Sequence, residues 1–170
     1  MKKKNVWISI AMAVMLLVLP LGALAAEENA GEETLEVSLE TIKMAVSLPA
    51  TWITFGGGEE MTAMGILYMG SNAEGDVMLQ ISHKQDEETL EIVKENFANF
   101  EGISNLEDIE VNGMPGLRYE LINSICYLVQ LEDGSLLGVN FTTFSGEIDD
   151  GMKATMDNIL HTLRAEDAAA

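Results

Sequence analysis

The segment LEDIEVNGMPGLRYELINSICYLVQLEDGSLLGVNF, residues 106–141, contains the clearest strand pattern in the chain. Asn112-Gly113 and Asp133-Gly134 are dipeptides that accept the positive φ angles of tight hairpin turns. Each lies between runs rich in Val, Ile, Tyr and Leu. A third connection near residues 122–124 divides the middle of the segment. The pattern therefore predicts four consecutive antiparallel strands, a meander in the C-terminal half.

Two helices are predicted to cover the sheet. Apolar residues recur at spacings of three and four over residues 86–101 and again after the acidic residues 147–150, so each helix has one apolar face. The faces consist of Leu90, Val93, Phe97 and Phe100 in the first helix, and of Met152, Met156, Ile159, Leu160 and Leu163 in the second. The strand positions expected to meet them are Leu117, Tyr119 and Leu121, and Leu137, Val139 and Phe141.

Strands also precede the first helix. Odd positions are apolar over residues 35–39 and even positions over residues 42–48, so the alternation changes phase near Glu40-Thr41. Two strands joined by a turn are favoured here over one strand with a bulge. Residues 64–69 and 77–81 are the next predicted strands. The sequence thus indicates an α+β fold, with a central antiparallel sheet of about six to eight strands flanked by two main helices.

Residues 1–25 have the pattern of a signal peptide. Three lysines precede an apolar run, Pro20 and Gly22 break the helix, and Ala23-Leu24-Ala25 supplies small residues at a cleavage site. We expect cleavage before Ala26, which gives a secreted, extracytoplasmic protein with no stable membrane anchor. The alternative is an N-terminal signal anchor, because the apolar run is close to the ~20 residues that span a bilayer.

The rest of the chain divides into residues 26–34, a flexible acidic segment, residues 35–164, a single domain, and residues 165–170, a frayed tail. Three of the nine basic residues lie in the leader, so six bases face 28 acids, a formal net charge of about −22. Nucleic acid is a poor partner for such a surface, because binding to phosphates depends on Lys and Arg. The charge suits solubility, and it also suits a basic partner or cations.

Few residues indicate catalysis or cofactor binding, and we expect no cofactor. Cys126 is the one cysteine and lies in a predicted strand, where a buried thiol acts as a small apolar group. Trp52, between two strands, is expected to anchor the core. His83 lies near Asp86 and Glu87, but these residues fall short of a zinc ligand set, so we interpret it as a solvated loop histidine. The chain lacks the common hydrolase and redox motifs.

Two acidic loops are weak candidates for a metal site. Calcium prefers oxygen ligands, which both loops supply, but neither has the spacing of a helix-loop-helix calcium loop. A plain hairpin loop is the favoured interpretation of residues 70–76. The candidate ligands are Asn72, Glu74 and Asp76 in the first loop, and Glu147, Asp149 and Asp150 in the second.

Four features together resemble the PsbP-like superfamily, over residues 35–163. They are the strand end Leu48-Pro49-x-x-Trp52, the run from Asn112 to Tyr119, the Asp133-Gly134 hairpin, and Ile159-Leu160-x-Thr162-Leu163 in the last helix. This fold is shared by the extrinsic photosystem protein PsbP and by a Ran-binding nuclear-transport factor. The resemblance implies an α/β/α sandwich and a non-enzymatic binding role, and it supplies no site residues.

The sequence therefore favours an exported, non-catalytic binding or accessory protein whose partner is a protein or an envelope component. One alternative is a cell-surface hydrolase that uses a carboxylate pair, since 28 acidic residues offer many pairs. The other is cation binding, such as that of calcium, by the acidic loops.

Overall fold

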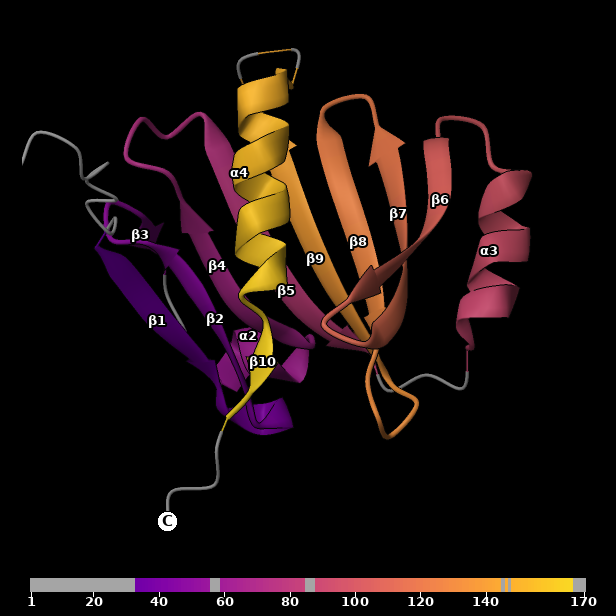
Figure 1. The fold of residues 1–170 in the computed structure, drawn as a ribbon, viewed down its shortest axis with the longest axis horizontal. Coiled ribbons are helices and arrows are strands. Elements are labelled where there is room, and N and C mark those ends of the chain that lie inside the picture. Colours follow the sequence, from indigo (N-terminus) through magenta and orange to yellow (C-terminus); the bar gives the residue numbers. More distant parts are fainter. Residues whose placement is uncertain (1–32, 56–58, 85–87, 145, 147, 167–170) are drawn as a thin grey trace, which may run out of the picture. The chain divides into compact units, whose positions relative to one another are not determined.

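A seven-stranded antiparallel sheet forms the centre of the fold (Figure 1). The computed structural model describes residues 33–55, 59–84, 88–144, 146 and 148–166, which belong to one compact unit. The strand order is β3-β4-β5-β9-β8-β7-β6. The strands are β3 (Ile53–Thr54), β4 (Ile66–Ser71), β5 (Val77–Lys84), β6 (Ser104–Val111), β7 (Met114–Leu121), β8 (Ser124–Gln130) and β9 (Leu136–Thr143).

The predicted meander is confirmed, because β6 to β9 are consecutive neighbours in the sheet. Its first turn has φ angles of 51° at Asn112 and 85° at Gly113, as a tight hairpin requires. Gly134 in the last turn has a φ of 86°. The turn chemistry read from the sequence thus sets the register of the sheet.

A second sheet of three strands contains β1 (Thr34–Leu39), β2 (Met44–Pro49) and β10 (Arg164–Ala165). A short 3-10 helix, η1 (Glu40–Ile42), joins β1 to β2, so the predicted turn is confirmed. Ala165, assigned from the sequence to the frayed tail, pairs with Met44 in the structure. Thr34, assigned from the sequence to the flexible segment, pairs with Pro49 in β1.

Three helices lie in the described part of the chain: α2 (Glu59–Ala63), α3 (Leu90–Ala98) and α4 (Asp150–His161). The helix predicted over residues 86–101 is shorter, because Thr89 caps it by accepting a hydrogen bond from the Ile92 amide. Asp149 caps α4 in the same way, with 2.7 Å between its Oδ1 and the Met152 nitrogen. None of the described helices is long and apolar enough to cross a bilayer.

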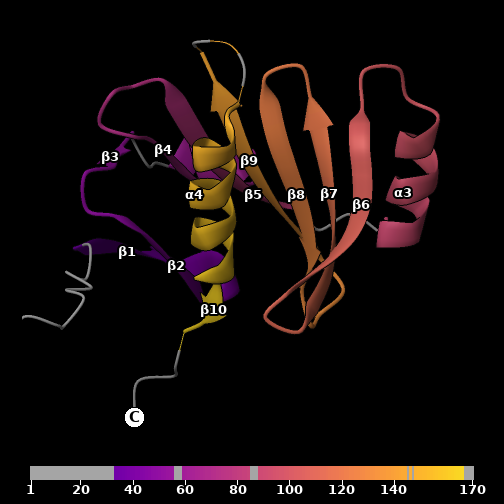
Figure 2. The same ribbon diagram turned by 45° about the horizontal axis from the view of Figure 1, so that its top comes forward.

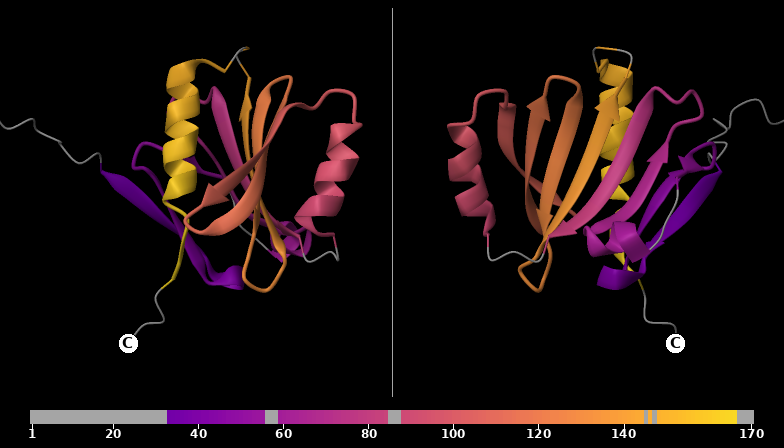
Figure 3. Two further views of the ribbon diagram at one scale, coloured as in Figure 1. Left: turned by 45° about the vertical axis from the view of Figure 1, so that its right-hand side comes forward. Right: turned by 180° about the vertical axis from the view of Figure 1, so that it is seen from behind.

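The helices α3 and α4 lie on opposite sides of the β6–β9 half of the sheet (Figure 3). On the α4 side, the core joins that helix to the second sheet and to alternate residues of β5, β8 and β9, including Leu137, Val139 and Phe141. Trp52 is buried there, edge-to-face with Phe141 at 6.4 Å between ring centroids, which confirms it as a core residue. On the α3 side, a smaller cluster includes Leu117 and Tyr119.

The lower half of β6 bends across the α4 side of the sheet (Figures 1 and 2). The turn that follows is attached to the end of α4, because the Asn112 side-chain amide donates to the carbonyl oxygens of His161, at 2.9 Å, and Leu163, at 2.7 Å. This contact fixes β6 relative to the helix, and the site described next lies between them.

Candidate functional site

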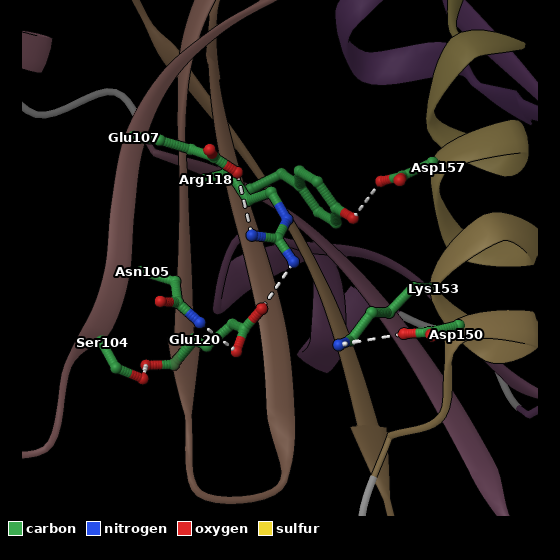
Figure 4. Close-up of polar contacts among 9 residues, drawn as sticks. Ser104, Asn105, Glu107, Arg118, Glu120, Asp150, Lys153 and Asp157 are labelled. Atoms are coloured by element: carbon green, nitrogen blue, oxygen red, sulfur yellow. Dashed lines mark hydrogen bonds and ion pairs between the residues drawn. The ribbon is translucent and has the colours of Figure 1, made fainter.

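A group of charged side chains lies on the α4 side of the sheet (Figure 4). Arg118 in β7 donates from Nη1 to Glu107 at 2.9 Å and from Nη2 to Glu120 at 2.6 Å. Glu107 is the cross-strand neighbour of Arg118 in β6, and Glu120 follows two residues later on the same face of β7. Strand register therefore brings one guanidinium between two carboxylates.

Tyr127 and Asp157 complete this group, which we call the Arg118 cluster. Tyr127 is the cross-strand neighbour of Arg118 in β8, and its hydroxyl donates to Asp157 Oδ1 at 2.6 Å. From the other side, Asn105 donates to Glu120 Oε2 at 2.8 Å. Asn105 has a φ of 50° and lies where the register of β6 and β7 shifts. The irregularity turns this amide toward Glu120, a common use of such bulges.

The surroundings of Arg118, Glu120 and Tyr127 move the pKa of each of these three groups away from neutrality. Burial disfavours the charged form of Arg118, yet hydrogen bonds to Glu120 and Glu107 more than offset this and raise its pKa. Burial likewise opposes ionisation of Glu120, but hydrogen bonds from Asn105 and Arg118 lower its pKa overall. Burial and the hydrogen bond to Asp157 raise the pKa of Tyr127. At pH 7 Arg118 is thus a cation, Glu120 a carboxylate and Tyr127 a neutral phenol.

A groove of about 390 Å³, the β6–α4 groove, opens beside this cluster. Its apolar lining consists of Ile109, Val111 and Leu160, and its carboxylates are Glu107, Glu110 and Asp157. Arg118, Tyr127 and His161 complete the lining. Arg118 is already paired within the cluster, and only 16% of its side chain is exposed. The groove therefore presents negative charge to a ligand.

The first acidic loop uses its candidate ligands internally. Asn72 donates to Asp76 Oδ1 at 2.5 Å, and its Oδ1 accepts from the backbone amides of Asp76 and Val77. Asn72 thus folds the loop back on itself, as in an Asx turn. Glu74 is exposed in the same loop. This arrangement is that of a hairpin loop.

In the second loop, Asp149 caps α4 and Asp150 pairs with Lys153 at 3.6 Å, whereas Glu147 lies outside the described residues. Within the described ranges, no three His, Cys, Asp or Glu side chains are arranged to hold a metal ion. Among the described candidates, Asn72 and Asp76 therefore contact each other, while Asp149 and Asp150 have separate roles at the start of α4.

His83 is not the solvated loop histidine that the sequence predicted. It is half-buried in β5, because that strand continues past residue 81 and pairs His83 with Leu137. Its Nε2 lies 2.9 Å from Ser135 Oγ, and that hydroxyl donates to Asp133 Oδ1 at 2.5 Å. Since the hydroxyl proton points to Asp133, His83 donates to Ser135 rather than activating it as a nucleophile.

Cys126 is buried in β8 as expected. Burial raises the pKa of its thiol, although a hydrogen bond with Tyr119 acts in the opposite direction. A neutral, buried thiol is a packing group and a poor nucleophile.

Comparisons with known proteins identify the fold. No family model matches the chain, and no curated protein sequence matches it. Among solved structures, the solution structure of cyanobacterial PsbP (CyanoP) from Synechocystis sp. PCC 6803 is similar, with a TM-score of 0.54 and 15% sequence identity. The match covers 86% of this chain and 99% of that one. The protein therefore has a PsbP-like fold, as the sequence motifs indicated.

Proposed function

We propose that this protein is an exported, non-catalytic accessory protein that binds another protein through the β6–α4 groove. The observation that carries the proposal is the Arg118 cluster, in which charged groups satisfy one another beside an open acidic groove. The PsbP-like fold supports an accessory or binding role.

The electrostatics of the cluster favour binding over proton transfer. A general acid or base works best with a pKa near the working pH, and a hydrolytic carboxylate pair needs one member with a raised pKa. In the cluster, the pKa of Glu120 is lowered and those of Arg118 and Tyr127 are raised. These directions suit a fixed charge pattern, which gives a binding surface specificity.

The groove fits a basic side chain of the partner. Glu107 and Glu110 line the groove from β6, and Asp157 lines it from α4. A Lys or Arg inserted between the two walls would form charge-assisted hydrogen bonds with these carboxylates.

Site-specific photo-crosslinking in cells that export the full chain tests this proposal. A photoreactive residue replaces Glu110 at the groove or, as a control, Glu95, which is exposed on α3. We expect a discrete crosslinked protein from position 110 only, and its loss when Glu107→Lys and Asp157→Lys reverse the charge of the walls. The same product from both positions, or none from either, would contradict the proposal.

The proposed export is tested on the same material. We expect the protein recovered outside the cytoplasm to begin at Ala26, as mass spectrometry of its N-terminal peptide would show. Replacing Ala25 with Arg should block cleavage and leave the protein membrane-bound, whereas Ala26→Ser should be processed normally. Recovery of an intact N-terminus at Met1 from the wild-type chain would instead favour the signal anchor.

A further inference from the structure

Several connections meet at one end of the large sheet, the end where β7 turns into β8 (Figures 1 and 3). The α3–β6 connection and the β9–α4 connection lie at the same end, since Ser104 pairs with Glu120 and Ser124 with Thr142. Backbone hydrogen bonds join three of the connections. The Thr143 amide donates to the Asn123 carbonyl, and the Phe144 amide donates to the Asp76 carbonyl of the β4–β5 loop. The β4–β5, β7–β8 and β9–α4 connections thus form one surface.

Large apolar side chains are exposed on this surface. Ile122 at the tip of the β7–β8 turn is 92% exposed, and Phe144 after β9 is 67% exposed. The pairing of Ser124 with Thr142 and the bond between Thr143 and Asn123 bring the segments of these two residues together. Leu121, at 39%, lies beside Ile122, although the sequence predicts that it packs on a helix. We call Leu121, Ile122 and Phe144 the apolar end. Contiguous exposed apolar groups on a soluble domain mark interaction surfaces, whereas scattered ones do not.

The charges around the apolar end have one sign. The three connections contain Glu74, Asp76 and Asp149 and no Lys or Arg among their described residues. Lys153, in the first turns of α4, is paired with Asp150.

Other bases lie elsewhere. Lys84 ends β5 at the opposite end of the sheet, and Lys43 and Arg164 line a groove beside the β6–β7 turn. The apolar end is therefore surrounded by unbalanced carboxylates.

We infer that the apolar end docks a protein surface on which apolar side chains are ringed by Lys and Arg. This inference rests on the proposed binding role and names the chemistry of the partner. Burial of the apolar side chains supplies affinity, and the acidic rim selects a basic ring. The charge of about −22 opposes pairing of two copies and opposes binding to anionic lipids.

Defined peptides test the inference on the exported, full-length product. The probes are an amphipathic Lys/Leu peptide, a Lys/Ser peptide of equal charge and a Glu/Leu peptide of equal hydrophobicity, with affinity measured by fluorescence anisotropy at physiological salt. We expect the Lys/Leu peptide to bind about ten-fold more tightly than either of the others.

A matched pair of charge-neutral variants locates the binding surface. Ile122→Ser with Phe144→Ser should remove the preference for Lys/Leu over Lys/Ser. Ile92→Ser with Met64→Ser should leave it intact, because these two residues are also exposed but lie on α3 and after α2. All four side chains are on the surface, so circular dichroism should report an unchanged fold.

Several outcomes would overturn the inference. Equal affinity for Lys/Leu and Lys/Ser would mean that charge alone attracts the peptide. If the chain binds phosphatidylcholine vesicles and the Ile122/Phe144 variant does not, the apolar end binds a lipid surface. If the chain forms a dimer in sedimentation equilibrium and the variant does not, the apolar end binds a second copy. Loss of peptide binding in Glu107→Gln with Glu110→Gln, but not in the apolar-end variant, would reject the inference and keep the groove proposal. Failure of every peptide to bind, together with no crosslink at position 110, would reject both.

Discussion

At the scale of single residues, Arg118 and Glu120 decide the character of the site. Both side chains are at least four-fifths buried, and they lie 2.6 Å apart. Removing Arg118 leaves Glu120 partly buried without a counter-charge, and removing Glu120 leaves Arg118 paired with Glu107 alone. Either change costs more than the pair itself contributes. A double-mutant cycle of Arg118→Met and Glu120→Gln should therefore give a coupling free energy of about 1–2 kcal/mol in urea unfolding at pH 7.

The pH dependence of this pair has a definite sign. Because folding lowers the pKa of Glu120 from its ordinary value of 4.5, the folded state favours the ionised carboxylate. Its contribution to stability is complete above the unfolded pKa and is lost as the pH falls through the folded pKa. Glu120→Gln should reduce the free energy of unfolding at pH 7 and flatten its decline below about pH 4.5. A variant whose profile stays parallel to the wild type at acid pH would contradict the assignment.

At the scale of elements, the β6–β7 turn holds both the meander and the end of α4. Asn112 must adopt a positive φ, and its amide also donates to two carbonyl oxygens. Asn112→Ala should cost about 2–3 kcal/mol, since it loses both hydrogen bonds and Ala tolerates the left-handed conformation less well than Asn does. Asn112→Gly keeps the backbone conformation and should cost only about 1 kcal/mol. Equal losses in thermal or urea unfolding would show that the amide alone matters.

The elements differ in how far the sequence predicts them. The meander is predictable because Asn112-Gly113 and Asp133-Gly134 restrict the backbone locally and the strands between them alternate. β3, β10 and α2 have two to five residues each, too few for a periodic signal, and depend on contacts with distant strands. The sequence predicts too early a start for α3, at residue 86, because a run of acids resembles a first helical turn. In the structure Thr89 caps the helix, which begins at Leu90.

The candidate site was harder to predict than the fold. Arg118, Glu107 and Tyr127 come from three strands, and only the register places them side by side. In the sequence, nothing at Arg118 itself indicates that Glu107 and Tyr127 lie beside it. The Asn112-Gly113 turn, however, fixes the pairing of β6 with β7, so the Glu107–Arg118 contact could have been inferred by counting outward from it. The bulge near Asn105 does not disturb that count, because it lies beyond Glu107.

At the scale of the whole molecule, charge repulsion opposes folding. Residues 26–170 carry a formal charge of about −22, and the described ion pairs neutralise only a few of these acids. Sodium chloride should therefore raise the midpoint of thermal unfolding between about 0.02 M and 0.3 M, since screening weakens the repulsion. Sucrose of matched osmolarity is the control for effects other than screening. A midpoint that falls with salt would mean that the ion pairs outweigh the repulsion.

The pairing of β10 with β2 sets the order in which the chain can reach its final form. Residues 164–165, which complete the small sheet, are synthesised long after their partners Ala45 and Met44. A nascent chain on the ribosome cannot close this sheet until residues 164–165 have emerged. The β10 edge of β2 therefore stays unpaired until α4, which precedes β10, has been synthesised.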